Sequence, residues 1–117
     1  MIETVKEKLK ELDPNVQYGI CRKQEEQDTW DCLLIRKRKW TKNGKSNTDE
    51  SFYLTVTIVR EDEIPEGMEK KVEKEMGLVG FRRTSKDAEY DYTIDTNDIV
   101  VELCTIEFVK AYKGRKL

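Results

Sequence analysis

The sequence contains no histidine, and it has only three cysteines. Histidine is the usual general base at neutral pH, so its absence excludes Ser-His-Asp and Cys-His catalysis. A zinc site needs four nitrogen or sulfur ligands in close pairs, and the chain has no C-x-x-C motif. We therefore expect no enzyme activity and no metal or other cofactor.

The three cysteines, Cys21, Cys32 and Cys104, are widely spaced, and each lies in an apolar or strand-like run. An odd number of separated cysteines does not suggest a disulfide framework. The pattern predicts free, buried thiols in a reducing compartment.

Long hydrophobic runs are also missing. No stretch approaches the roughly 20 apolar residues that cross a bilayer, and the N-terminal residues lack the apolar region of a signal peptide. We therefore expect a cytosolic protein with no membrane partner. Charge of one sign is not in excess either, because 22 lysines and arginines stand against 24 acidic residues and leave a net charge of -2. Any electrostatic role must therefore be local.

The chain has 117 residues, 37% of them hydrophobic, which is enough for one domain with one modest core. Residues 1–117 are therefore expected to form a single domain. Apolar residues recur at helical spacing over 2–12, and Asp13-Pro14-Asn15 ends that helix. A second short helix is expected over 64–76, with Gly77 as its C-terminal cap.

Strand patterns occupy much of the remaining chain. Residues 16–23 and 32–40 have strand patterns, and 51–60 is the clearest strand because its alternate apolar residues share one face. A final strand over 99–112 alternates imperfectly, which predicts a bulge. The order is α-β-β-β-α-β-β. It predicts an α+β fold, with a mainly antiparallel sheet of about five strands and two helices on one face.

The strands on either side of Asn43-Gly44 are expected to pair as a long β-hairpin arm, because Asn-Gly is a strong turn signal. Residues 41–51 at the tip are polar and have almost nothing to bury, so we expect a mobile tip. Residues 113–117 are expected to be a flexible tail.

Two strings resemble ligand-binding motifs but lack a required residue. Gly44-Lys45-Ser46 matches the end of a phosphate-binding loop, but Lys39 stands where the first glycine belongs. The acidic residues over 87–91 alternate as in a calcium loop, but Tyr92 replaces the glycine of the sharp turn. Neither nucleotide nor calcium binding is expected.

A basic run lies in the predicted arm, with six lysines and arginines between Arg36 and Lys45. On a regular strand Arg36, Arg38 and Trp40 point to one side, and the two lysines between them point to the other. Single-strand nucleic-acid binders place several stacking aromatic residues among basic ones, and this run has one tryptophan. Nucleic acid is therefore not the expected partner. A small nucleic-acid-binding or general protein-interaction module that uses the basic hairpin remains the alternative, as does a charged arm without a partner.

Acidic residues gather elsewhere, over 61–66 and over 87–98. Such segregation suits a head-to-tail contact between copies, in which the basic arm of one subunit meets the acidic segments of the next, and such contacts can close into rings. Trp40 is either the anchor of this contact or the residue that closes the end of the core. The candidate interface residues are Arg36, Arg38, Lys39, Trp40, Lys42, Lys45, Glu61, Asp62, Asp87, Glu89 and Asp91.

Two segments carry a family resemblance: "TIVREDEIPEGMEKKVEKEMGLVGFRR" and "EYDYTIDTNDIVVELCTIEFVK". They resemble the small tail terminator or tail completion proteins encoded in the head-to-tail assembly region of tailed phages and prophages of Gram-positive bacteria. The resemblance is best over 52–110. Its most specific parts are Ile64-Pro65-Glu66-Gly67, the glycine pattern before Phe81, and Tyr90-Asp91-Tyr92, none of which is a catalytic signature.

The resemblance implies a non-enzymatic α+β subunit that forms a ring, commonly of six copies. Such a ring caps the finished tail tube and presents a surface to the head connector proteins. The implied partners are other copies of the chain, the tail tube and the head connector. The implied location is the bacterial host cytoplasm during assembly and then the virion head-tail junction.

Overall fold

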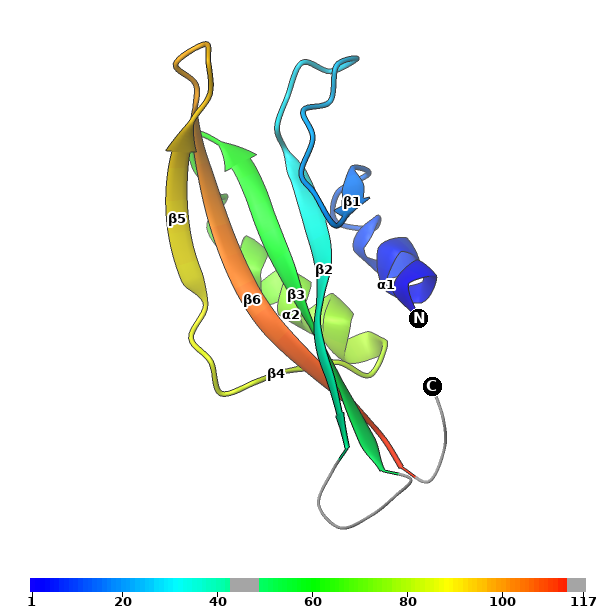
Figure 1. Ribbon diagram of the computed structural model, residues 1–117. Coiled ribbons are helices and arrows are strands. Elements are labelled where there is room, and N and C mark those ends of the chain that lie inside the picture. The colour runs from blue at the N-terminus through cyan, green and yellow to red at the C-terminus, as the bar shows by residue number, and fades with distance from the viewer. Residues whose placement is uncertain (43–48, 114–117) are drawn as a thin grey trace.

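The computed structural model describes residues 1–42 and 49–113, which form an α+β fold (Figure 1). The predicted fold class is therefore confirmed. The elements, in chain order, are α1 (Ile2–Leu9), β1 (Val16–Tyr18), β2 (Cys32–Lys42), β3 (Glu50–Glu61), α2 (Met68–Leu78), β4 (Arg82–Arg83), β5 (Glu89–Ile94) and β6 (Val100–Tyr112). Neither helix of the described residues is long and apolar enough to span a membrane.

The described strands form one six-stranded sheet in the order β1-β2-β3-β6-β4, and β5 pairs with the same side of β6 as a second neighbour. β5 pairs along the first part of β6, and the short β4 pairs near its end. All neighbours are antiparallel except β1 and β2, which run parallel. The sheet is thus mixed, because the long connection over 19–31 lets the chain cross back to the end at which β1 began.

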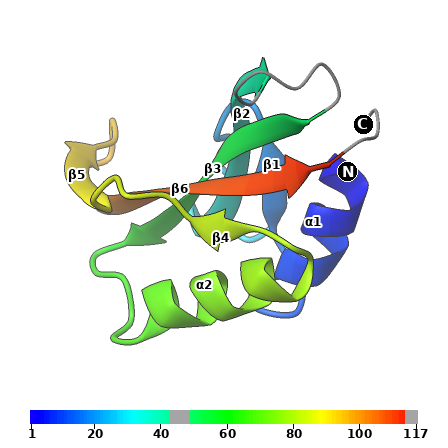
Figure 2. The ribbon, with the colours of Figure 1, turned by 90° about the horizontal axis from the view of Figure 1, so that it is seen from below.

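Both helices cover one face of the sheet (Figure 2), as predicted. Val5 and Leu9 of α1 and Val72 and Met76 of α2 pack against alternate residues of the central strands. Those strand residues include Leu33, Ile35, Leu54, Val56, Ile58, Ile106 and Phe108. The residues that β3 and β6 contribute to this core alternate along each strand, which matches the alternation of apolar residues in the sequence.

The opposite face of the sheet, which we call the open face, is covered by neither of the two described helices (Figure 2). One end of it has a small apolar cluster built on Cys32, Leu34, Val59 and Val101. The middle is polar, because β3 and β6 present threonines there, and Thr57 and Thr105 share a hydrogen bond of 3.0 Å. The open face is therefore apolar at one end and polar toward the arm.

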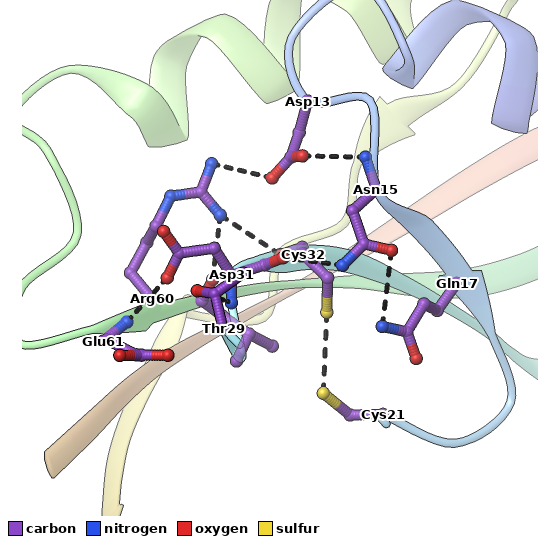
Figure 3. A network of polar contacts seen from close by, with 10 residues as sticks. Asp13, Asn15, Gln17, Cys21, Thr29, Asp31, Cys32, Arg60 and Glu61 are labelled. Carbon is purple, nitrogen blue, oxygen red and sulfur yellow. Dashed lines mark hydrogen bonds and ion pairs between the residues drawn. The ribbon is translucent and has the colours of Figure 1, made fainter. Parts of the chain in front are cut away.

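A polar network fixes the chain after α1 against the sheet (Figure 3). The buried carboxylate of Asp13 accepts a hydrogen bond of 2.8 Å from the backbone N–H of Asn15 and forms an ion pair of 2.9 Å with Arg60. The Arg60 guanidinium also donates to the carbonyl oxygen of Val59, at 2.8 Å. Asp13 thus attaches the connection after α1 to β3. The helix predicted over 2–12 is shorter than expected, because α1 ends at Leu9 and a turn leads to Asp13.

Other sequence predictions about the elements were also wrong, and the helix expected over 64–76 begins only at Met68. The strand expected over 16–23 is only three residues long, because Gly19 has a φ of 87° and turns the chain away. β6 pairs with β3 without a register shift, so the predicted bulge is absent from that pairing. Gly77 lies inside α2, and the left-handed residue after the helix is Gly80, with a φ of 90°.

The hairpin arm is three strands wide, because β6 continues beside β3 as far as Tyr112. Figure 1 shows these strands extending beyond the helices. Thr41 pairs with Ser51 and Lys42 with Glu50, so regular pairing continues into both ends of the predicted tip. The rest of that tip, 43–48, and most of the predicted tail, 114–117, lie outside the described residues.

Candidate functional site

A register shift between Lys37 and Lys39 changes the faces of the basic strand. Before the shift Arg36 pairs with Thr55 on the open face; after it Trp40 pairs with Phe52 on the helix-bearing face. The prediction that Arg36 and Trp40 share one side is therefore wrong, because an extra residue in a strand reverses the alternation beyond it. Lys39, opposite Tyr53, lies on the open face instead.

A polar groove of about 390 Å³ crosses the open face beside the arm. Its basic residues come from β2 and from the connection between β4 and β5, and its threonines come from the two central strands. Acidic residues from the β4–β5 connection, β5 and β6 line it as well. The lining residues are Arg36, Lys37, Arg38, Thr55, Lys86, Asp87, Glu89, Thr105 and Glu107.

Glu107 is the most buried charged residue of this groove, with 7% of its surface exposed. Its Oε1 accepts a hydrogen bond of 2.9 Å from the hydroxyl of Thr84. Its Oε2 lies 3.5 Å from Nε of Arg38 and 3.6 Å from Nζ of Lys86. Oε2 accepts no hydrogen bond from the described residues, so the two cations balance its charge at a distance.

The groove brings together residues that the sequence assigned to opposite sides of an interface. Arg36 and Arg38 of the basic run line the same groove as Asp87 and Glu89 of one acidic segment. Charges that were expected on two different subunits thus line one groove of a single subunit. Among the remaining basic candidates is Lys39, whose Nζ lies 4.6 Å from the centre of the Tyr53 ring.

The other predicted residues are spread along the molecule. Trp40 is 57% exposed, so it does not close the core. Lys42 ends β2, and Lys45 lies outside the described residues. Glu61 and Asp62 lie at the end of β3 farthest from the arm, where Glu61 accepts a hydrogen bond of 2.7 Å from the backbone N–H of Trp30.

β5 is an edge strand whose tyrosines attach it to the helix-bearing side. The hydroxyl of Tyr90 donates to Glu69 of α2, and the hydroxyl of Tyr92 donates to the buried Glu102 of β6. Glu102 also accepts a hydrogen bond of 2.7 Å from the backbone N–H of Ile64. The Tyr90-Asp91-Tyr92 string therefore connects β5 to the start of the second helical segment.

The acidic side chains of β5 project from the other face. Glu89 pairs with Thr105 and Asp91 with Leu103, and both of those partners lie on the open face. All six residues of β5 are exposed, and the strand pairs with β6 on one side only. Within the described residues, its outer edge has no partner strand.

β2 also has an edge that no described strand covers. β1 pairs only with Leu33 to Ile35, so the outer edge of residues 36–42 is open along the arm. Figure 1 shows β2 and β5 on opposite sides of the sheet. The molecule thus has one basic and one acidic sheet edge, facing away from each other.

Sequence reasoning missed the groove residues Lys86 and Glu107, the Thr84 hydroxyl that donates to Glu107, and Glu102. Both glutamates stand beside apolar residues in the last strand of the sequence, and both are buried in the structure. The signal that the sequence offered for these two residues was a single charged residue among the apolar residues of a strand. It could not distinguish an exposed carboxylate from one buried by a neighbouring strand.

No group of three histidine, cysteine, aspartate or glutamate side chains in 1–42 and 49–113 is arranged to hold a metal ion. The chain matches no known protein-family model and no curated protein sequence.

Proposed function

We propose that this chain is a non-enzymatic structural protein of a phage or prophage that acts in tail completion or head-tail joining. It forms a ring on the tail tube, and its partners are other copies of itself, the tube and the head connector. The proposal rests on the family resemblance given by the sequence and on the two uncovered sheet edges. It places the protein in the bacterial host cytoplasm during assembly and at the virion head-tail junction afterwards.

The observation that carries the proposal is a match between the faces of the two edges. On the open face, Arg36 and Lys39 of β2 are basic, and Glu89 and Asp91 of β5 are acidic. Opposite charges on neighbouring strands attract when the strands are paired. If the β5 edge of one copy joins the β2 edge of the next, these side chains lie on the same face of the joined sheet.

The helix-bearing face matches as well. Trp40 on β2 and Tyr90 and Tyr92 on β5 project from that face, and all three are at least half exposed. Aromatic pairs across strands add stability beyond the backbone hydrogen bonds. Joining the edges would therefore cover the exposed aromatic residues on one face while pairing charges on the other.

The strand directions also fit such a joint. Antiparallel pairing from β2 through β3 and β6 to β5 makes β5 run opposite to β2. Two copies in the same orientation would therefore meet as an antiparallel pair. Because the two surfaces differ, the contact is head-to-tail and is the type that closes into a ring when the rotation permits.

The groove argues against the nucleic-acid alternative. A phosphate backbone that reached Arg36 and Arg38 would also meet Asp87, Glu89 and Glu107. Nucleic-acid surfaces are strongly positive, whereas this groove has nearly balanced charge. Binding of an oligonucleotide with an affinity that falls steeply with salt would favour the alternative instead.

The first test is the mass of the protein in solution, by native mass spectrometry or light scattering, over a range of protein concentrations and at low and high salt. We expect a discrete multi-subunit species that salt weakens, because its charge pairs are partly exposed. The second test adds purified tail tubes that lack a terminator and measures co-sedimentation. A chain that neither self-associates nor binds tubes would overturn the proposal.

A charge swap tests the joint itself. Lys39→Glu should weaken assembly at least tenfold, and Asp91→Lys should do the same, because each change opposes like charges across the joint. Combining both changes in one chain should restore assembly, since each subunit then presents a reversed but matching pair. Lys74→Glu on the exposed side of α2 is the control, with the same charge change away from both edges. Failure of the double variant to recover would contradict this pairing of edges.

A further inference from the structure

Cys21 and Cys32 lie side by side, with 3.5 Å between their sulfur atoms (Figure 3). Cys21 belongs to the connection between β1 and β2, and Cys32 is the first residue of β2. Both are free thiols. Eleven positions separate them in the sequence, so the fold of this connection brings them together.

The two thiols differ in their access to solvent. Cys32 is fully buried in the small apolar cluster of the open face. Cys21 is partly exposed and lines an apolar hollow of about 240 Å³, together with Trp30, Ile94 and Leu103. A small reagent that enters the hollow therefore reaches Cys21, with Cys32 directly beside it.

The two thiols also differ in pKa, and the more accessible thiol has the lower value. The hydrogen bond between the two thiols lowers the pKa of Cys21, although partial burial opposes this shift. The same hydrogen bond and full burial both raise the pKa of Cys32. The thiolate, which is the reactive form, therefore develops at the accessible sulfur.

We propose that Cys21 and Cys32 form a reversible disulfide site, in which Cys21 reacts with hydrogen peroxide and Cys32 resolves the product. The arrangement of an accessible cysteine beside a second, protected cysteine is typical of peroxide-reactive pairs. The proposal is independent of ring formation.

In the first step the Cys21 thiolate attacks one peroxide oxygen and the O–O bond breaks. The departing hydroxide takes a proton and becomes water, which leaves a sulfenic acid on Cys21. The sulfur of Cys32 then attacks the sulfur of Cys21, and its proton leaves with the sulfenic hydroxide as a second water. Two thiols are oxidised by two electrons, and one peroxide is reduced to two waters.

The disulfide would fix the connection that forms one wall of the apolar hollow. This connection also carries Trp30, whose indole N–H donates to Asp95 at 3.1 Å. Cys104 lies on the helix-bearing face, fully buried, and burial raises the pKa of its thiol. It is therefore an internal control that peroxide should leave unchanged.

The test treats the reduced full chain with hydrogen peroxide and maps the tryptic peptides by mass spectrometry. Cleavage after Lys10, Arg22, Lys23 and Arg36 places the two cysteines in separate peptides, 11–22 and 24–36. We expect these peptides to be linked, with a loss of about 2 Da from the intact chain for the two hydrogens removed. Dithiothreitol should separate them again, and Cys104 should remain alkylatable.

Three variants sharpen the result. Cys104→Ser should link the two peptides at the wild-type rate, and Cys21→Ser should leave Cys32 unmodified. In the Cys32→Ala variant the reaction should stop after the first step, so Cys21 should gain oxygen and no linked peptide should form. If the wild-type chain forms no 11–22 to 24–36 link, or if Cys104 reacts as fast as Cys21, the proposal is wrong, whatever the stability of the variants.

Discussion

Glu102 shows how one buried carboxylate can organise three segments. It accepts hydrogen bonds from the hydroxyl of Tyr92 on β5 and from the backbone N–H of Ile64 before α2. The hydrogen bond from Tyr92 is the larger cause of a lowered pKa of Glu102, and the hydrogen bond from Ile64 adds to it. Desolvation opposes the shift. The resembling segments Ile64-Pro65-Glu66-Gly67 and Tyr90-Asp91-Tyr92 thus meet at one residue of β6. Their role in the isolated subunit is structural.

This pKa shift predicts a pH-dependent stability. A carboxyl group with a lower pKa in the folded than in the unfolded protein adds stability above the unfolded pKa, and that contribution is lost as pH falls through the folded pKa. Tyr92→Phe removes the larger cause, so the pKa of Glu102 should rise and the loss of stability in acid should become smaller. Urea unfolding of both proteins between about pH 3 and 7 measures how the free energy of unfolding depends on pH.

Tyr18→Phe is the matched control for this prediction, because it removes the hydroxyl of an exposed tyrosine on β1. It should leave the pH profile of unfolding unchanged. An identical profile for Tyr92→Phe and the wild type would show that the Tyr92 hydroxyl does not stabilise the Glu102 carboxylate.

At the scale of elements, the end of α2 decides where the chain joins the sheet. The backbone N–H of Phe81 donates to the carbonyl oxygen of Met76, at 3.0 Å, and this bond reverses the chain. Gly80 between them has a φ of 90°, and an added Cβ would lie 2.9 Å from Cε of Lys110. Phe81 can then be buried beside α2.

Two alanine substitutions at this helix end should change the stability of the fold in opposite directions. Gly80→Ala places a side chain in the left-handed region and should destabilise the fold by about 1 to 2 kcal/mol. Gly77→Ala lies within α2, where an added Cβ meets nothing within 4 Å, and it should stabilise the fold. The expected gain is about 0.5 to 1 kcal/mol. Chemical unfolding of both variants tests this, and two changes of the same sign would contradict the assignment of the helix end.

At the scale of the whole molecule, the arm makes the subunit elongated, with principal extents of 52 × 25 × 24 Å. Its radius of gyration is 15.4 Å, against about 13 Å for an ordinary compact domain of this length. The arm exposes residues 36–40 of β2, although Phe52 of β3 is buried within it. Its open edge and exposed tryptophan are therefore available to a neighbouring copy.

Hydrogen exchange can locate the contact of the assembled protein. If the β2 and β5 edges join, amides in 36–42 and 89–94 should exchange more slowly at concentrations where the oligomer forms, because their outward N–H groups become paired. Amides in the middle of β3 are paired on both sides already and should change little. The Lys39→Glu variant at equal concentration is the control that lacks assembly. Protection confined to other segments would place the contact elsewhere.

The sequence by itself determined the fold class and the main elements. The helical spacing of apolar residues in α1 and α2 and the alternation in β3 are local properties, since side-chain direction follows from the backbone period. The turn after α1, where Asp13 accepts a hydrogen bond from the backbone N–H of Asn15, follows from local turn chemistry too. The composition also identified the segregation of basic and acidic segments along the chain.

Only the tertiary structure decided which of these residues meet. The register shift after Lys37 moved Trp40 to the helix-bearing face, and a shift of this kind depends on the pairing of two strands. The parallel position of β1 brought Cys21 close to Cys32, and the placing of β5 on β6 brought Glu89 into the groove of Arg36. Contacts between distant segments depend on how the sheet is assembled, and the pattern of a single segment does not contain that information.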